Sequence, residues 1–172
     1  NTAALQIRRG EVTTLAAVRQ CLTPIYIPDD EFEDAFADLR LRNRGTSGKR
    51  LRYFLARIER QLSGADITDE GMTATIEHIL PENPDNADWD QFKPDGHERN
   101  VERLGNYSLL ERNLNSREAG NSGFAEKQAI YSKSQYKTSQ ELCDYSEWTE
   151  ETIHSRQTKM AKTAKTVWAI QT

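Results

Sequence analysis

A histidine directly follows a carboxylate in residues 75–84, which read TIEHILPENP. The run is apolar and strand-like, and it stops at Pro81 because proline has no backbone N–H to donate. An ionisable pair inside such a run costs free energy unless its groups are paired or used. Glu77 and His78 therefore lie either at a solvent-facing edge or in a functional site.

Two asparagine-containing stretches further along the chain could complete such a site. Residues 103–110 read RLGNYSLL, and residues 112–116 read RNLNS. Hydrolysis of DNA needs a base that takes a proton from water, a hard cation that holds the phosphate, and a group that fixes the tautomer of the base. Together with the Glu-His pair, these stretches supply candidates for all three tasks.

Two short strands and several helices are expected to position these stretches. The apolar spacing changes to a strand pattern at residues 75–80. A second strand is expected at 103–110, where Gly105 and Asn106 allow a bulge or a tight bend. The site would then lie where these two strands meet.

Apolar residues at helical spacing predict helices, and stretches rich in Gly, Pro and polar residues predict the loops between them. The predicted helices are 11–22, 29–39, 49–62, 123–134 and 149–170, with Thr149 as the cap of the last and a short helix within 111–123. Loops are predicted at 43–48, which reads NRGTSG, and at the acidic stretch 82–100. The fold class is therefore mainly α with a small two-stranded core, α+β.

The composition describes a very polar chain with a net charge of −4 and a mean hydropathy of −0.81. No apolar run approaches the roughly 18 residues that span a bilayer, and residues 1–10 lack the order of a signal peptide. We therefore expect a cytoplasmic protein with no membrane partner, in which Cys21 and Cys143 are reduced structural thiols. Because the first residue is Asn1, we expect the chain to be the C-terminal part of a longer protein.

The charged residues are distributed unevenly along the chain. Residues 29–38 hold six acids and no base, whereas residues 40–60 hold eight bases and one acid. Such separation can build a basic face on an acidic protein. The basic segment 40–60 carries three arginines that are candidates for weak DNA contacts: Arg50, Arg52 and Arg57.

The order IEHILPENP, LGNYSLL, NLNS and GFAEK resembles the C-terminal nuclease domain of GmrSD-type modification-dependent restriction enzymes and related phage-defence proteins. This group belongs to the HNH (His-Me finger, ββα-metal) nucleases, and the resemblance is most specific between Ile76 and Lys127. It implies a small ββα-metal core and a metal-dependent endonuclease that hydrolyses the phosphodiester bonds of double-stranded, modified DNA. In larger members a ParB-like nucleotide-hydrolysing domain precedes this part, and a start at Asn1 fits an excised piece.

The resemblance implies a role for each matching residue. His78 matches the general base that activates water, and Glu77 matches a metal ligand. Asn106 matches the middle asparagine, which holds the catalytic loop and orients the histidine. Asn115, nine residues later, matches the second metal ligand, and Asn113 competes with it because spacing alone does not separate the two.

The same resemblance makes Lys127 a possible phosphate contact or alternative ligand, together with Arg117. Oxygen ligands suit Mg²⁺ first and Mn²⁺ or Ca²⁺ as substitutes, and the absence of paired CxxC motifs argues against zinc. The remaining histidines and the tryptophans are expected to have structural roles: His97, His154, Trp89, Trp148 and Trp168.

The resemblance and the helix pattern also suggest how the chain is organised. Residues 1–70 would form a helical extension or a linker to an N-terminal domain, 71–135 the nuclease core, and 136–172 a helical cap. A different function stays open at this stage. The arginine-rich helix 49–62 could serve a non-catalytic domain that binds DNA or another protein, with the Glu-His pair in a structural role.

Overall fold

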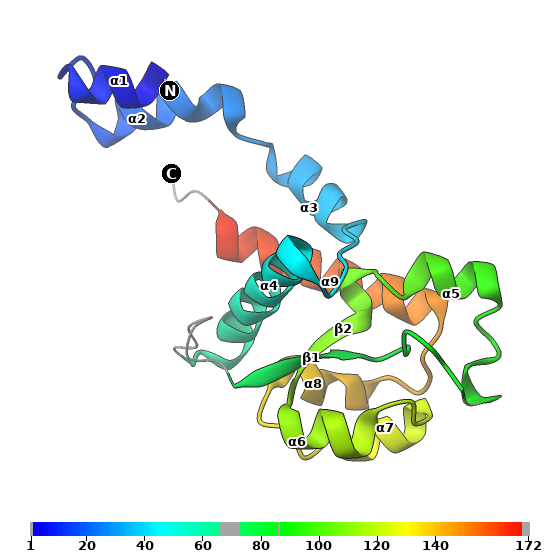
Figure 1. The fold of residues 1–172 in the computed structure, drawn as a ribbon. Coiled ribbons are helices and arrows are strands. Elements are labelled where there is room, and N and C mark those ends of the chain that lie inside the picture. The colour runs from blue at the N-terminus through cyan, green and yellow to red at the C-terminus, as the bar shows by residue number, and fades with distance from the viewer. Residues whose placement is uncertain (1, 66–72, 86, 170–172) are drawn as a thin grey trace. The chain divides into compact units, whose positions relative to one another are not determined.

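The computed structural model describes residues 2–65, 73–85 and 87–169 (Figure 1). The chain divides into two compact units, residues 1–32 and 33–172. In the smaller unit, the helices α1 (Thr2–Arg8) and α2 (Leu15–Leu22) are followed by a 3₁₀ turn at Thr23–Ile25. Helix α2 begins later than predicted because the Thr14 side chain accepts a hydrogen bond from the Ala17 N–H and caps it.

The larger unit contains the two strands and most of the helices. In chain order its elements are α3 (Asp29–Ala37, which begins just before the boundary), α4 (Gly45–Ser63), β1 (Ala74–His78), α5 (Pro94–Asn100), β2 (Tyr107–Glu111), α6 (Arg112–Leu114), α7 (Phe124–Tyr131), α8 (Lys137–Gln140) and α9 (Glu150–Trp168). Short turns of 3₁₀ or π geometry lie at Ala87–Trp89, Leu104–Asn106, Asn115–Ala119 and Glu141–Asp144. The expectation of a mainly α, α+β fold is confirmed.

Strands β1 and β2 pair antiparallel, with His78 opposite Tyr107 and Glu77 opposite Ser108. Because side chains alternate along a strand, one face of the hairpin carries His78 and the other carries Glu77. Strand β1 ends at His78 rather than at residue 80. The Ile79 N–H still donates to the Asn106 carbonyl at 3.0 Å, but the Asn106 N–H donates to the Arg103 carbonyl at 2.9 Å and does not complete the pair.

The main core lies around the hairpin, the α6–α7 segment and the start of α9. Its buried side chains are Ile79, Leu80, Trp89, Phe92, Leu110, Leu114, Ala119, Phe124, Ile130, Tyr131, Leu142, Trp148 and Ile153. A second, aromatic cluster joins Phe36, Phe54 and Trp168, with Phe54 and Trp168 in edge contact at 5.6 Å between ring centroids. Both clusters remove large apolar surfaces from water, which is the main stabilising contribution to the fold.

Helix α9 fixes the bend that precedes β2. Its buried Arg156 donates to the carbonyls of Gly105 and Tyr107, both at 2.7 Å. A Cβ on Gly105 would collide with the Ile153 carbonyl, so glycine permits the close approach. The Thr149 cap is confirmed, because Thr149 and Thr152 form reciprocal capping hydrogen bonds at the start of α9.

Helix α4 begins at Gly45, so most of the loop predicted at 43–48 is its first turn. The Gly48 N–H donates to the Arg44 carbonyl at 3.0 Å, and the Ser47 hydroxyl accepts from the Arg42 N–H at 2.9 Å. These bonds offset the low helix propensity of the GTSG sequence. Helix α5 likewise forms inside the predicted loop 82–100, with Pro94 in its first turn, where proline is tolerated.

The expected organisation into an extension 1–70, a nuclease core 71–135 and a cap 136–172 stays a prediction. Helix α4 belongs to the unit that contains the strands. Its buried Glu59 carboxylate accepts hydrogen bonds from the N–H groups of Lys137 and Thr138, at 2.9 and 2.8 Å, and so ties α4 to α8. Across the described ranges, no helix is both long and apolar enough to span a bilayer.

Candidate active site

His78 is the last residue of β1 and lies on the hairpin face that carries Tyr107. Its side chain is 14% exposed, and its ring packs edge-on against Tyr107 at 4.6 Å between centroids. The buried Nε2 atom has no hydrogen-bond partner within the described part of the chain. A buried polar atom without a partner costs free energy, and such atoms in native folds call for a functional or structural reason.

Burial lowers the pKa of His78 to about 4, because the charged imidazolium is poorly solvated there; the Lys127 ammonium lowers it further and Glu102 opposes the shift. The imidazole is therefore neutral at pH 7 and can accept a proton. The Glu82 carboxylate lies 3.5 Å from Nε2 without the geometry of a hydrogen bond, and with a neutral ring this contact is not an ion pair. Glu82 is mostly exposed, so it covers Nε2 with a side chain that is free to move.

Asn106 holds the backbone that follows His78. Its fully buried amide accepts from the Leu80 N–H at 2.8 Å and donates to the Leu80 carbonyl at 3.0 Å. The same side-chain oxygen accepts from the Trp148 indole N–H at 3.1 Å. Asn106 thus pins the segment beside His78 without touching its ring, which fits the loop-holding part of the expected role.

Glu77 points to the opposite face of the hairpin and is buried. Its Oε1 accepts from the Lys127 ammonium at 2.7 Å and from the Tyr131 hydroxyl at 2.9 Å. Lys127 is fully buried and also donates to the His78 carbonyl at 2.8 Å. In contrast to the expectation of a phosphate contact, Lys127 fixes the end of β1 from inside.

Burial dominates the electrostatics of this pair. It raises the pKa of Glu77, although Lys127 and Tyr131 oppose the rise, and it lowers the pKa of Lys127, although Glu77 opposes the fall. The charged forms lose hydration that their mutual attraction only partly replaces. The Glu77–Lys127 pair therefore positions the chain at a cost rather than adding stability over an apolar pair.

The two candidate asparagines of the following segment differ in their contacts. The Asn115 amide donates to the Thr75 hydroxyl at 2.9 Å and to the Ile76 carbonyl at 3.1 Å, so it joins the turn Asn115–Ala119 to β1. Asn113 is exposed. Asn115 is thus the one that lies against β1, whereas the side chain of Arg117 lies outside the described part of the structure.

Glu77 and Asn115 do not fit the metal site that the resemblance implies, in this arrangement of side chains. The Lys127 ammonium lies 2.7 Å from the Glu77 carboxylate, where its positive charge would repel a divalent cation, and Glu77 points away from His78. Among the residues described, no cluster of three or more His, Cys, Asp or Glu side chains could hold a metal ion. The geometry therefore assigns no step of a reaction to a metal.

The three candidate arginines of α4 lie in different environments. Arg52 donates to the Ala74 carbonyl at 2.9 Å and lies beside β1. Arg50 is exposed, and Arg57 is half-buried with no hydrogen bond to its Nε among the described residues. His97 has a structural role, since its Nε2 lies 2.8 Å from the Pro81 carbonyl.

Three residues near the His78 ring were missed by the sequence analysis: Glu82, Glu102 and Tyr107. Glu82 follows His78 by four residues, and Tyr107 directly follows Asn106. Tyr107 could have been found from antiparallel pairing of the two predicted strands, because it lies opposite His78, whereas Glu82 comes after the end of β1. Glu102 carried no such signal, because it comes from the segment between α5 and the bend.

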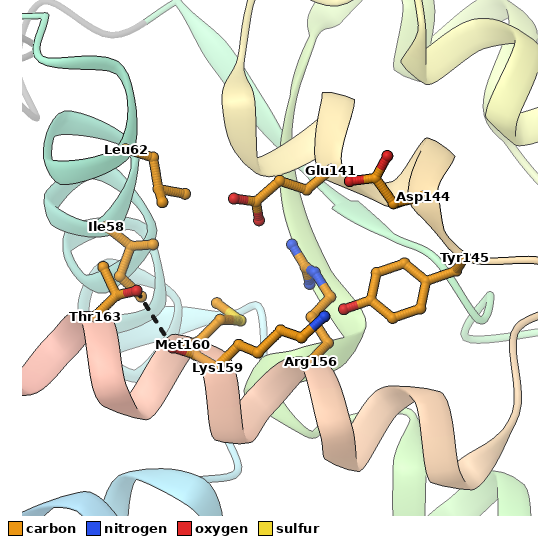
Figure 2. A pocket seen from close by; sticks show the side chains of 9 residues that line it. All are labelled: Ile58, Leu62, Glu141, Asp144, Tyr145, Arg156, Lys159, Met160 and Thr163. Atoms are coloured by element: carbon orange, nitrogen blue, oxygen red, sulfur yellow. Dashed lines mark hydrogen bonds between the residues drawn. The ribbon is translucent and has the colours of Figure 1, made fainter.

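A separate cavity lies between α4, the turn Glu141–Asp144 and α9 (Figure 2). Glu141 and Asp144 face Arg156 and Lys159 across it, and the Lys159 ammonium lies 5.2 Å from the centre of the Tyr145 ring. Burial raises the pKa of Glu141, and Arg156 opposes the rise. Its lining includes no histidine or cysteine, so it offers no base or nucleophile comparable to His78.

The domain contains a two-stranded antiparallel sheet flanked by helices. A neutral histidine ends one strand, and an anchoring asparagine precedes the other. These features define a small α+β domain with one candidate base. Comparison with protein-family models matches residues 26–163 to the family described as GmrSD restriction endonucleases, C-terminal domain. The match covers most of the chain, so the chain belongs to this family. No curated protein sequence matched.

Proposed function

We propose that this domain is a DNA endonuclease that hydrolyses phosphodiester bonds, with His78 as the general base. The observation that carries the proposal is the neutral, partly buried imidazole whose Nε2 has no hydrogen-bond partner in the described structure. Membership of a restriction-endonuclease family supports DNA as the substrate. The order of the matching motifs supports the HNH type, since His78, the middle Asn106 and then Asn115 follow one another along the chain.

In the proposed reaction, His78 takes a proton from a water molecule whose oxygen attacks the phosphorus atom. The bond from phosphorus to the 3′ oxygen breaks, the departing oxygen takes a proton from solvent, and a 5′ phosphate remains. Lys127 and Asn106 act on this step through the backbone of His78 and of Leu80. Their task is to hold the base in one place, because misplacement of a reacting group lowers the rate steeply.

A divalent cation is part of the proposal, with Mg²⁺ as the first candidate and Mn²⁺ or Ca²⁺ as substitutes. This requirement rests on the family resemblance, because the described side chains do not form a metal site by themselves. Such a cation would stabilise negative charge on the phosphate and the departing oxygen. We also propose that modified DNA is the target and that an upstream ParB-like domain governs its recognition, as in the larger enzymes that the chain resembles.

The test is cleavage of supercoiled plasmid, both unmodified and from a strain that modifies cytosine, by the parent and by His78→Ala with Mg²⁺. We expect the substitution to lower the rate at least about a hundredfold, the usual contribution of general base catalysis. EDTA serves as the control for the metal, and urea unfolding shows that the variant is folded. Cleavage by His78→Ala at the parental rate would contradict the assignment of the base.

A non-catalytic DNA-binding function is the second candidate. It is favoured by the coverage of Nε2 by Glu82 and by the low pKa of His78, which makes the imidazole a weak proton acceptor as it stands. DNA binding by the parent without cleavage at any concentration of Mg²⁺ or Mn²⁺ would support this candidate over the first.

A further inference from the structure

An open groove of about 460 Å³ lies between the start of α4 and β1. Its lining residues are Asn43, Arg44, Gly45, Gly48, Lys49, Arg52 and Ile76. Three of the seven are cations and none is an acid, although the chain as a whole has a net charge of −4. The groove is thus a local concentration of positive charge on an acidic protein.

Two of these cations are free to meet a ligand. Arg44 and Lys49 are exposed, and within the described structure neither side chain has a hydrogen bond or an ion pair with another residue. Arg52 uses one nitrogen to donate to the Ala74 carbonyl, and that bond holds its guanidinium at the edge of β1. A guanidinium that keeps other N–H groups can still bind an anion.

The backbone of the groove adds to its attraction for anions. Gly45 and Gly48 line it and carry no side chains that would fill it, although the Gly48 N–H itself is bonded to the Arg44 carbonyl. Helix α4 has no side-chain cap and no acid in its first turn, whereas the equally long α9 has a capping box and two glutamates. The positive end of the α4 dipole is therefore not neutralised by the helix itself.

The groove shares strand β1 with the candidate active site. Its lining residue Ile76 lies two residues before His78 on β1, and because side chains alternate, both point to the same face of the two-stranded sheet. Two residues of a strand span only about 6.6 Å, so one DNA strand can lie over both positions.

We propose that this groove binds the phosphodiester backbone of the DNA strand whose neighbouring phosphate lies at His78. Arg44 and Lys49 contact the phosphates directly, and Arg52 contacts them from the edge of β1. The inference rests on the proposed function, because it takes DNA as the substrate. Of the predicted set, it keeps Arg52 and replaces Arg50 and Arg57, which do not line the groove, by Arg44 and Lys49.

The test measures binding of the full chain to a fluorescein-labelled DNA duplex by anisotropy, in EDTA so that the duplex stays intact, over a series of salt concentrations. We compare the parent with the double variant Arg44→Gln/Lys49→Gln. The slope of log affinity against log salt should fall by about 1.8, roughly 0.9 for each lost phosphate contact. Affinity at low salt should fall roughly tenfold or more.

A matched double variant separates this effect from loss of net charge. Lys137→Gln/Lys162→Gln removes two exposed cations that lie outside the groove and are not among the candidate DNA contacts. We expect its affinity to stay within about twofold of the parent and its slope to stay unchanged. Equal weakening by both double variants, or an unchanged slope in the groove variant, would overturn the proposal.

A second arm distinguishes DNA from free phosphate, which shares the same chemistry. Inorganic phosphate is added to the labelled complex and compared with sodium chloride at equal ionic strength. We expect no displacement beyond that of chloride, and excess displacement would assign the groove to small phosphates instead. Binding is measured without cleavage. A chain that binds DNA as expected in both arms but does not cleave it would therefore contradict the proposed function and leave the groove proposal standing.

Discussion

Glu77 and His78 are neighbours in sequence, yet they belong to two different environments. On one face of β1, Glu77 is buried with its carboxylate bonded to Lys127 and Tyr131. On the other face, His78 is partly exposed, and its Nε2 has no hydrogen-bond partner in the described structure. The hydrogen bonds of Glu77 stabilise a single geometry on one face, whereas the Nε2 of His78 on the other face is available for chemistry. The side-chain alternation of a strand alone separates the two roles.

The two faces are linked through the backbone. Lys127 reaches the His78 carbonyl from the Glu77 side, and Asn106 reaches the next residues from the far side. The buried network therefore fixes where the imidazole lies without contacting it. This arrangement explains why a buried ion pair that adds little stability is present beside a candidate base.

The largest effect on stability is expected when the cation of the buried face is removed. Lys127→Met leaves the Glu77 carboxylate without its partner, and we expect a loss of about 3–5 kcal/mol in the free energy of unfolding. Urea denaturation measures this loss. The double variant Glu77→Leu/Lys127→Met is the control, and it should recover most of the loss because an apolar pair needs no hydration. A single variant as stable as the parent would mean that the pair is not buried as described.

A smaller effect should appear in the dependence of stability on pH. The pKa of His78 is about 4 in the folded chain and about 6.5 when unfolded, so below pH 6.5 the unfolded chain takes up the proton first. The His78 contribution to stability is therefore present above pH 6.5 and is lost as the pH falls to about 4. The total loss is roughly 3 kcal/mol.

The measurement is urea unfolding at a series of pH values for the parent and for His78→Phe, which keeps an aromatic ring against Tyr107. Other groups titrate in both proteins, so the difference between the two curves isolates His78. A difference that stays constant between pH 4 and 7 would show that His78 titrates normally and is not desolvated.

The smallest effect on stability is expected from the Tyr131 hydroxyl on the buried face. Tyr131→Phe removes the hydroxyl that donates to Glu77 and leaves Lys127 in place. We expect a loss of about 1–2 kcal/mol in the free energy of unfolding, the value of a hydrogen bond to a charged group. Tyr136→Phe is a suitable comparison, because its hydroxyl is not part of this network. A loss equal to that of Lys127→Met would mean that Tyr131 is the main partner of Glu77.

The sequence predicted the strands and the anchoring asparagine because their signals are local. Pro81 ends the apolar run, and the Gly105–Asn106 pair marks the bend before β2. The alternation of side chains along a strand also implies that Glu77 and His78 face opposite ways. It could not tell which face is buried, since that depends on Lys127, fifty residues later in the chain. A lysine on an amphipathic helix is normally solvated, and no local pattern distinguishes the buried exception.

The start of α4 was missed for a related reason. The residues GTSG have low helix propensity, and the bonds that make them helical involve Arg42 and Arg44 just upstream. The basic groove was missed with it, because its residues share a surface only once that turn is helical. The arginines of residues 49–62 carried a correct charge signal, but their distribution around the helix depends on where α4 meets β1.

The most direct test of the division between the two faces is the single-turnover rate of DNA cleavage per folded molecule, measured for Glu77→Gln beside His78→Gln. We expect Glu77→Gln to cleave within severalfold of the parent at the same Mg²⁺ requirement, because the amide oxygen can still accept from Lys127. We expect His78→Gln to lose cleavage at least about a hundredfold. Loss of cleavage in folded Glu77→Gln, with a raised Mg²⁺ requirement, would contradict the account and make Glu77 a metal ligand.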